Sequence, residues 1–157
     1  MLGVLDTLRR LLPGLWAGLL LTVALVATPA PFALLAQADA GRVVSRILAQ
    51  EAYASLAFSV LLLGLERVRA KRRSDAGTGS QFSLEMALAA GALFCTVAGY
   101  FGLQPMLAAA KAGQGLLSFG QLHAVSAAFY VLKALLVVTL AVVAVRAASG
   151  VSRPPSS

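Results

Sequence analysis

The sequence is poor in charged residues and holds only one cysteine and one histidine. Asp, Glu, Lys and Arg make up 12% of its 157 residues, whereas a typical soluble domain carries roughly 25%. The single cysteine, Cys95, excludes an intrachain disulfide and a cysteine-cluster metal site. The single histidine, His123, excludes a haem held by two histidines of one chain. No Ser-His-Asp set, acid pair or zinc motif is present, so we predict no catalytic residues, no metal, no cofactor and no enzyme activity.

Apolar residues make up 59% of the chain, and its mean hydropathy is +0.85. They are concentrated in four long runs. A helix rises about 1.5 Å per residue, so each run is long enough to cross a hydrocarbon core of about 30 Å. This pattern excludes a soluble domain. We therefore predict an all-α integral membrane protein, a single domain over residues 1–157, with spans at about residues 11–35, 47–65, 84–103 and 122–145.

Lys and Arg residues are divided unevenly between the two ends of these spans. Nine lie in the head, in the connection at residues 66–81 and in the tail, and three lie in the other connections, namely Arg42, Arg46 and Lys111. Cytoplasmic loops carry the excess of positive charge. We therefore predict cytoplasmic termini (N-in, C-in) and a four-helix up-down bundle. The expected location is a bacterial cytoplasmic (inner) membrane, with the protein as a multi-pass component.

The connections follow from the same division of charge. Residues 37–45 are expected to form a short polar connection, residues 66–81 a flexible basic cytoplasmic loop, and residues 149–157 a disordered tail. Because the basic residues are confined to short loops and ends, they favour the lipid bilayer as partner and argue against nucleic acid.

The first apolar run resembles a signal peptide but is longer than one. It covers about 25 residues at 11–35, whereas the apolar part of a signal peptide has roughly 7–15. We therefore expect a retained span, with Trp16 at the cytoplasmic interface. Gly14 and Gly18 form a GxxxG, a spacing that lets two helices approach closely.

Two prolines, Pro29 and Pro31, interrupt the last third of this run. Proline removes a backbone N–H and clashes with the preceding turn, so the helix is expected to break there. The break is either a simple kink against neighbouring helices or an opened backbone that lines a site, because freed carbonyl groups in a bilayer need protein or water partners.

A polar stripe marks the fourth run. His123, Ser126, Tyr130 and Lys133 follow spacings of three, four and three. At about 100° per residue they lie within roughly 80° of one another, so they should face the bundle. A lysine at this depth costs roughly 2.5–3.5 kcal/mol on insertion scales. No partner carboxylate for Lys133 is obvious at mid-depth: Glu51 is the nearest in level but lies somewhat high. A neutral lysine and a lysine facing a water pocket are the alternatives.

The stripe has three interpretations. A structural hydrogen-bond ladder is the default, and a proton or ion path and a ligand site are the alternatives.

A second set of polar residues is expected near the outer ends of the helices. Gln50, Glu51, Tyr53 and Met106 are the candidates for an outer vestibule. The alternative is that helix ends are always more polar than helix centres, with Glu51 paired to Arg46 at the interface. Glu51 and Met106 could in principle join the lone histidine on copper, but one histidine makes a metal role the weaker reading.

Several landmarks, taken in order, resemble a known family. They are Leu15-Trp16-Ala17-Gly18, Pro29-Ala30-Pro31-Phe32, Ala40-Gly41-Arg42, Pro105, and Phe119 to His123 with Ser126. This order resembles the small four-span proteins similar to transmembrane protein 205, a bacterial domain-of-unknown-function family. The resemblance implies a four-helix membrane protein without an established activity. A eukaryotic relative is linked to platinum-drug resistance, which hints at transport or trafficking.

The chain also distantly resembles the membrane domain of copper-resistance D proteins, which share a Trp-x-Gly in a helix. The copper association of that domain is not carried over, because the histidines that it would need are missing.

The leading hypothesis is a structural or accessory subunit that packs against other membrane proteins, either in a homo-oligomer or in a larger complex. The alternative is a protein that handles a small solute, a metal ion or protons through the outer vestibule and the stripe. A cofactor-bound redox subunit is the weakest of the three.

Overall fold

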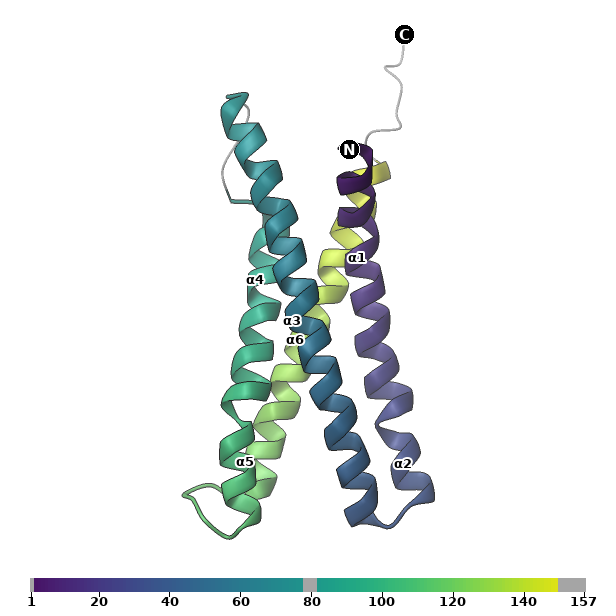
Figure 1. Cartoon of the computed structure of the whole chain (residues 1–157), viewed down its shortest axis with the longest axis vertical. Helices are drawn as coiled ribbons and strands as arrows, with labels where there is room; N and C mark the ends of the chain where they lie inside the picture. Colours follow the sequence, from purple (N-terminus) through teal and green to yellow (C-terminus); the bar gives the residue numbers. More distant parts are fainter. Residues whose placement is uncertain (1, 78–81, 150–157) are drawn as a thin grey trace.

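The computed structural model describes residues 2–77 and 82–149, and their regular structure is helical (Figure 1). The chain runs through eight helical segments: α1 (Leu2–Thr22), the π-helix η1 (Val23–Ala27), α2 (Pro29–Leu34), α3 (Gln37–Asp75), α4 (Leu84–Thr96), the π-helix η2 (Val97–Gly102), α5 (Gln104–Lys111) and α6 (Phe119–Ser149). Joined end to end they make four rods, each long and apolar enough to cross a membrane. The prediction of an all-α, multi-pass membrane protein is confirmed at this level.

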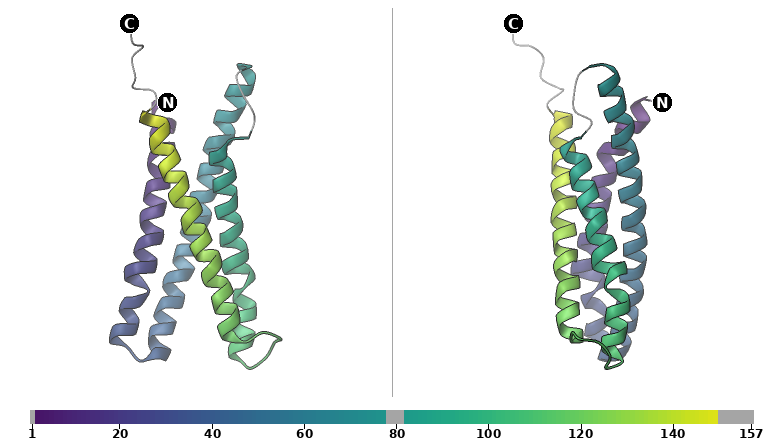
Figure 2. Two further views of the ribbon diagram at one scale, coloured as in Figure 1. Left: turned by 180° about the vertical axis from the view of Figure 1, so that it is seen from behind. Right: turned by 90° about the vertical axis from the view of Figure 1, so that its left-hand side faces the viewer.

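The four rods run alternately up and down (Figures 1 and 2). The start of α1, the end of α6 and the end of α3 lie at one end of the bundle, which we call the terminal end. The α2–α3 and α5–α6 connections lie at the opposite end. Each of α1 and α4 packs against both α3 and α6, so α3 and α6 stand diagonally across the bundle. Toward the terminal end, the pair α1–α6 diverges from the pair α3–α4.

The bundle has a small core near its middle. Nine buried residues form it: Trp16, Ala17, Leu20, Leu62, Leu88, Ala89, Ala92, Val137 and Leu140. Alanines on α4 let neighbouring helices come close, as is usual between helices in lipid. The outward faces carry large aliphatic side chains such as Leu25 and Leu34. A surface of this kind suits hydrocarbon.

α3 is longer than the apolar run predicts. Residues 66–75, expected as the start of a flexible loop, continue the helix to Asp75, and residues 37–45, expected as a connection, begin it at Gln37. Residues 66–75 contain no glycine or proline, and Glu66 pairs with Arg69 one turn later. Gly77, with φ at +68°, follows the end of the helix. Residues 78–81 of the expected loop, and residues 150–157 of the expected tail, lie outside the described residues.

The predicted break at Pro29 and Pro31 is confirmed. The regular α-helix ends at Thr22, a π-helical stretch follows, and the amide of Thr28 bonds to the carbonyl of Val23, 2.9 Å away and five residues back. Pro29 then begins α2, where a missing N–H costs nothing.

The third rod continues past its expected end at residue 103 for a similar reason. Pro105 lies in the first turn of α5, which carries the helix on to Lys111.

Candidate functional site

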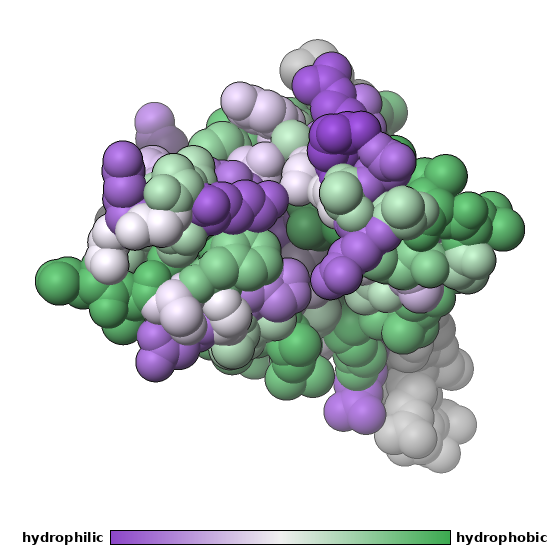
Figure 3. Space-filling view, turned by 90° about the horizontal axis from the view of Figure 1, so that it is seen from below, coloured by the Kyte–Doolittle hydropathy of each residue, from purple (hydrophilic) through white to green (hydrophobic). Residues whose placement is uncertain are grey.

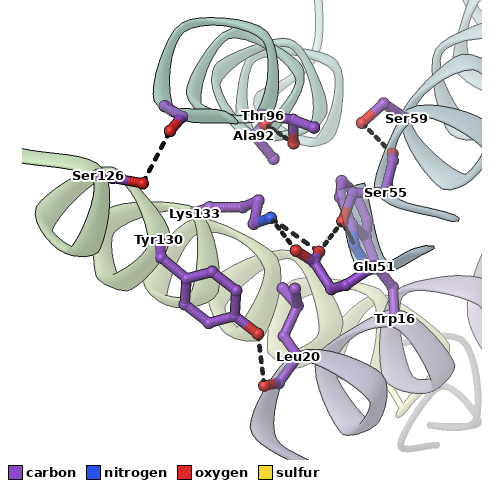
Figure 4. Close-up of polar contacts among 11 residues, drawn as sticks. Trp16, Leu20, Glu51, Ser55, Ser59, Ala92, Thr96, Ser126, Tyr130 and Lys133 are labelled. Carbon is purple, nitrogen blue, oxygen red and sulfur yellow. Dashed lines mark hydrogen bonds and ion pairs between the residues drawn. The ribbon is translucent and has the colours of Figure 1, made fainter. Parts of the chain in front are cut away.

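The polar stripe of α6 bonds to each of the other three rods (Figure 4). Ser126 Oγ donates to the carbonyl of Gly99 in η2, at 2.9 Å. One turn on, Tyr130 Oη donates to the carbonyl of Leu20 in α1, also at 2.9 Å. Lys133 then meets Glu51 of α3. The expectation that this stripe faces the bundle is confirmed for these three residues. His123 lies at an exposed position, where it stacks on Phe119.

Lys133 and Glu51 form an ion pair across the diagonal of the bundle. Lys133 Nζ lies 2.7 Å from Glu51 Oε1 and 2.9 Å from Oε2, so both carboxylate oxygens accept from one ammonium group. Lys133 is 3% exposed and Glu51 is 4% exposed. The pair to Arg46 expected as the alternative for Glu51 is therefore replaced by a pair to Lys133.

Glu51 is held on its other side by a chain of hydrogen bonds. Ser55 Oγ donates to Glu51 Oε1, and Trp16 Nε1 of α1 donates to Ser55 Oγ at 2.9 Å. Phe58, one turn beyond Ser55, stacks on the Trp16 ring with centroids 5.8 Å apart. The Glu51 carboxylate thus accepts hydrogen bonds from Lys133 of α6 and from Ser55 of its own helix. The Trp16 indole of α1 donates to the same Ser55 hydroxyl. Trp16, expected at the cytoplasmic interface, is fully buried inside the bundle core.

The surroundings of Lys133 complete its desolvation. Its ammonium lies 4.7 Å from the centre of the Tyr130 ring, within range of a cation–π contact. Two buried charges lose several kcal/mol of hydration each, and only close pairing with further hydrogen bonds offsets that loss. Glu51 and Lys133 have both, so the pair can persist inside the bundle. An ionisable pair at this depth is by default a candidate functional site.

The hydroxyl groups of the stripe meet backbone that departs from a regular α-helix. Gly99 lies within η2, and Leu20 comes three residues before η1. A π-helical stretch changes the i→i+4 hydrogen-bond ladder to i→i+5. Inside a bilayer the backbone groups around such a change must find partners within the protein. Ser126 therefore donates to the π-helical part of the third rod, and Tyr130 donates to the last turn of α1, directly before η1.

The expected outer vestibule does not form from its four candidate residues. Glu51 is buried, whereas Gln50, Tyr53 and Met106 lie at exposed positions. At about 100° per residue, Gln50 and Tyr53 lie about 100° and 200° around α3 from Glu51, outside its buried face. Met106 lies on another rod, in α5. Figure 3 shows the opposite end of the bundle, where hydrophilic side chains are scattered among hydrophobic ones.

A second group of charges lies at the terminal end, and the sequence reading missed it. We call it the terminal cluster; its members are Arg9, Glu66, Arg69, Ser83 and Glu85. Arg9 Nη1 lies 3.2 Å from Glu66 Oε1 and 3.6 Å from Glu85 Oε1. Arg69 Nη1 lies 3.6 Å from Glu66 Oε2 and 3.5 Å from Glu85 Oε1.

Ser83 joins the terminal cluster to the start of α4. Its Oγ accepts from the amide of Met86 as an N-cap and lies 3.4 Å from Glu66 Oε2. A signal for the cluster was present in the sequence: Glu66 and Glu85 are acids within otherwise basic or apolar stretches that flank the same hairpin.

The described residues offer no ready metal centre. Among residues 2–77 and 82–149, no three His, Cys, Asp or Glu side chains gather where they could hold an ion. Of the three residues considered for copper, His123 and Met106 are exposed, and Glu51 uses both oxygens for Lys133.

Comparison with known proteins yields one match. The family described as domain of unknown function (DUF4149) matches residues 11–115, which include Trp16, Glu51 and the terminal-cluster acids but stop before α6. No curated protein and no solved structure matches the chain. The resemblance to a domain-of-unknown-function family is thereby confirmed, whereas the likenesses to transmembrane protein 205 and to copper-resistance D proteins stay predictions.

Proposed function

We propose that this chain, which belongs to the DUF4149 family of domains of unknown function, is a structural or accessory subunit that packs against other membrane proteins. One observation carries the proposal: the polar groups of the α6 stripe that face the bundle bond to backbone and side chains of the other three rods. An interior that is cross-linked in this way favours a fixed scaffold over a path for solutes.

The orientation and location belong to the same proposal. The basic residues of the terminal end, which include Arg9, Arg10 and five positions between residues 67 and 73, outnumber those of the opposite end. This bias favours cytoplasmic termini in a bacterial inner membrane. No enzyme activity is proposed.

The partner surface that we favour is the outward face of α1. Gly14 and Gly18 are exposed, and a Cβ added at either would meet nothing within 4 Å. In lipid, two small residues four apart let a second helix approach closely, whether it comes from another subunit or from a second copy of this chain.

Purification of the tagged full chain in mild detergent, followed by mass spectrometry of co-purifying chains, tests this proposal. We expect stoichiometric membrane subunits with the wild type and their loss with the double variant Gly14→Leu/Gly18→Leu. Gly64→Leu is the matched control, because Gly64 is also exposed with open space beside it but lies on α3. A lone chain carrying bound metal or pigment would contradict the accessory role.

A second candidate function is proton or small-solute handling, and the ion pair at the bundle centre favours it. The likeness to transmembrane protein 205 also points toward transport. The double variant Glu51→Gln/Lys133→Met removes both charges while retaining similar volumes. If the variant folds and still assembles but proteoliposomes lose a wild-type proton or solute flux, transport replaces scaffolding as the function. Unchanged assembly with no flux in either protein supports the accessory role.

A further inference from the structure

A groove lies between α1 and α3 at the terminal end, outside the site of the α6 stripe. Its volume is about 270 Å³. Nine residues line it: Leu5, Asp6, Arg9, Leu65, Val68, Arg69, Arg72, Arg73 and Ala76. This volume leaves room for a small polar group such as a phosphate.

We propose that this groove binds the phosphodiester headgroup of an anionic glycerophospholipid, such as phosphatidylglycerol, from the leaflet at the terminal end. The lining has two chemical halves. Four arginines supply cationic donors, with Asp6 as the only acid of the lining, and four apolar residues form the remainder. Guanidinium groups bind phosphate oxygens through paired hydrogen bonds, and apolar walls suit the start of the acyl chains.

Arg9 is the residue that points to a bound anion. It is 9% exposed, and its Nη1 is shared between Glu66 and Glu85. Its Nε is the one buried side-chain nitrogen or oxygen without a hydrogen-bond partner among the described residues. A buried donor without an acceptor destabilises the fold. A phosphate oxygen in the groove beside Arg9 would bring an acceptor to this guanidinium.

The carboxylates of the terminal cluster orient two of the arginines and leave the groove cationic. Glu66 and Glu85 hold the guanidinium groups of Arg9 and Arg69 in place. Arg72 and Arg73 add two further positive charges on the exposed last turns of α3.

The apolar part of the lining selects a lipid over a soluble phosphate. Val68 is half-exposed in the groove lining, and Leu5 and Leu65 of the same lining are partly exposed. A soluble phosphate gains nothing from these side chains, whereas the glycerol and first methylenes of a phospholipid remove them from water.

The proposal can be tested on the full-length protein in detergent by native mass spectrometry. Dioleoylphosphatidylglycerol is titrated in, with dioleoylphosphatidylcholine and inorganic phosphate as separate arms. We expect one phosphatidylglycerol per chain to bind at least tenfold more tightly than phosphatidylcholine, and millimolar phosphate not to displace it. The double variant Arg72→Gln/Arg73→Gln should weaken this binding about 30-fold.

The matched control is Arg67→Gln/Lys71→Gln. It removes the same charge from the same exposed stretch of α3, but neither residue lines the groove. We expect this variant to stay within about threefold of the wild type. If both double variants weakened phosphatidylglycerol binding equally, the effect would be a general attraction to positive charge, and the proposed site would be overturned. Displacement by inorganic phosphate, or no preference over phosphatidylcholine, would overturn the lipid assignment.

Discussion

Within residues 2–77 and 82–149, charge is buried in two places, and the two are built differently. In the middle of the bundle, one lysine meets one glutamate, and Ser55 completes the coordination of the carboxylate. At the terminal end, Arg9 and Arg69 are each shared between Glu66 and Glu85. The central pair has no substitute for either partner, whereas each charged member of the terminal cluster has two partners of opposite charge. Loss of one residue should therefore have unequal consequences at the two places.

The difference follows from depth. The centre of the bundle is far from water, so a charge there is tolerated only with a close partner and supporting hydrogen bonds. The terminal cluster lies at one end of the bundle beside a groove, where water can take the place of a lost partner. The most direct comparison is therefore to remove one cation from each site and measure the decrease in the free energy of unfolding.

Lys133→Leu should have the largest effect. It leaves the Glu51 carboxylate buried and unpaired, and removal of one partner of a buried pair costs about 3–5 kcal/mol. Unfolding by SDS titration, followed by circular dichroism, measures the change. The double variant Glu51→Gln/Lys133→Met should recover most of the lost stability, because no unpaired charge remains. A double variant as unstable as the single one would show that packing, rather than charge, dominates here.

Arg9→Gln should have a smaller effect, about 1–3 kcal/mol in the same titration. Glu66 and Glu85 keep Arg69 as a partner when Arg9 is neutralised, so neither acid is left alone. Arg10→Gln, at the neighbouring exposed position, serves as control and should behave as the wild type. If Arg9→Gln lowered the free energy of unfolding as much as Lys133→Leu, the two sites would depend equally on a single cation, contrary to the difference described above.

Trp16→Phe should cost about 0.5–1.5 kcal/mol, the net value of one hydrogen bond. The variant keeps an aromatic ring against Phe58 but loses the donor to Ser55 Oγ. Ser55→Ala removes the acceptor and also the donor to Glu51, so it should cost more than Trp16→Phe. The reverse order would indicate that the indole contributes mainly by its volume.

Asp39→Asn should have the smallest effect, less than about 0.5 kcal/mol. Its pair with Arg42 is exposed at the start of α3, and exposed ion pairs contribute little because water and salt screen them. The thermal midpoint in 50 mM and 500 mM salt should be the same for this variant and the wild type. A difference between the two proteins that persists in 500 mM salt would show that this pair is less open to solvent than its exposure indicates.

The sequence predicted the rods well and the partners between them poorly. Apolar runs fix where a chain crosses lipid, and proline chemistry fixes where a helix breaks, so the four spans and the interruption before Pro29 were predictable. Hydropathy identifies only the apolar part of a helix and misses helical turns that carry charged residues. The predicted second span therefore begins about ten residues after the start of α3.

That misplacement concealed the partner of Lys133. Glu51 lies fourteen residues after Gln37, and Lys133 lies fourteen residues after Phe119, so both are about 21 Å from the same end of the bundle. Judged from the apolar run alone, Glu51 instead appeared to lie one turn below the surface. The terminal cluster was not predicted for a similar reason. Glu66 was assigned to a loop, so the helix face on which it lies could not be inferred.

The diagonal pairing of Glu51 with Lys133 also limits how α3 and α6 can respond to the thickness of a surrounding bilayer. Helices held only by aliphatic contacts can slide and tilt separately when a bilayer is thinner or thicker than their apolar length. Here α3 and α6 are pinned to each other at one level, and sliding by one turn would separate the two charges by about 5 Å. The bundle must therefore tilt as a unit or deform the surrounding lipid, so hydrophobic mismatch acts on the whole protein at once.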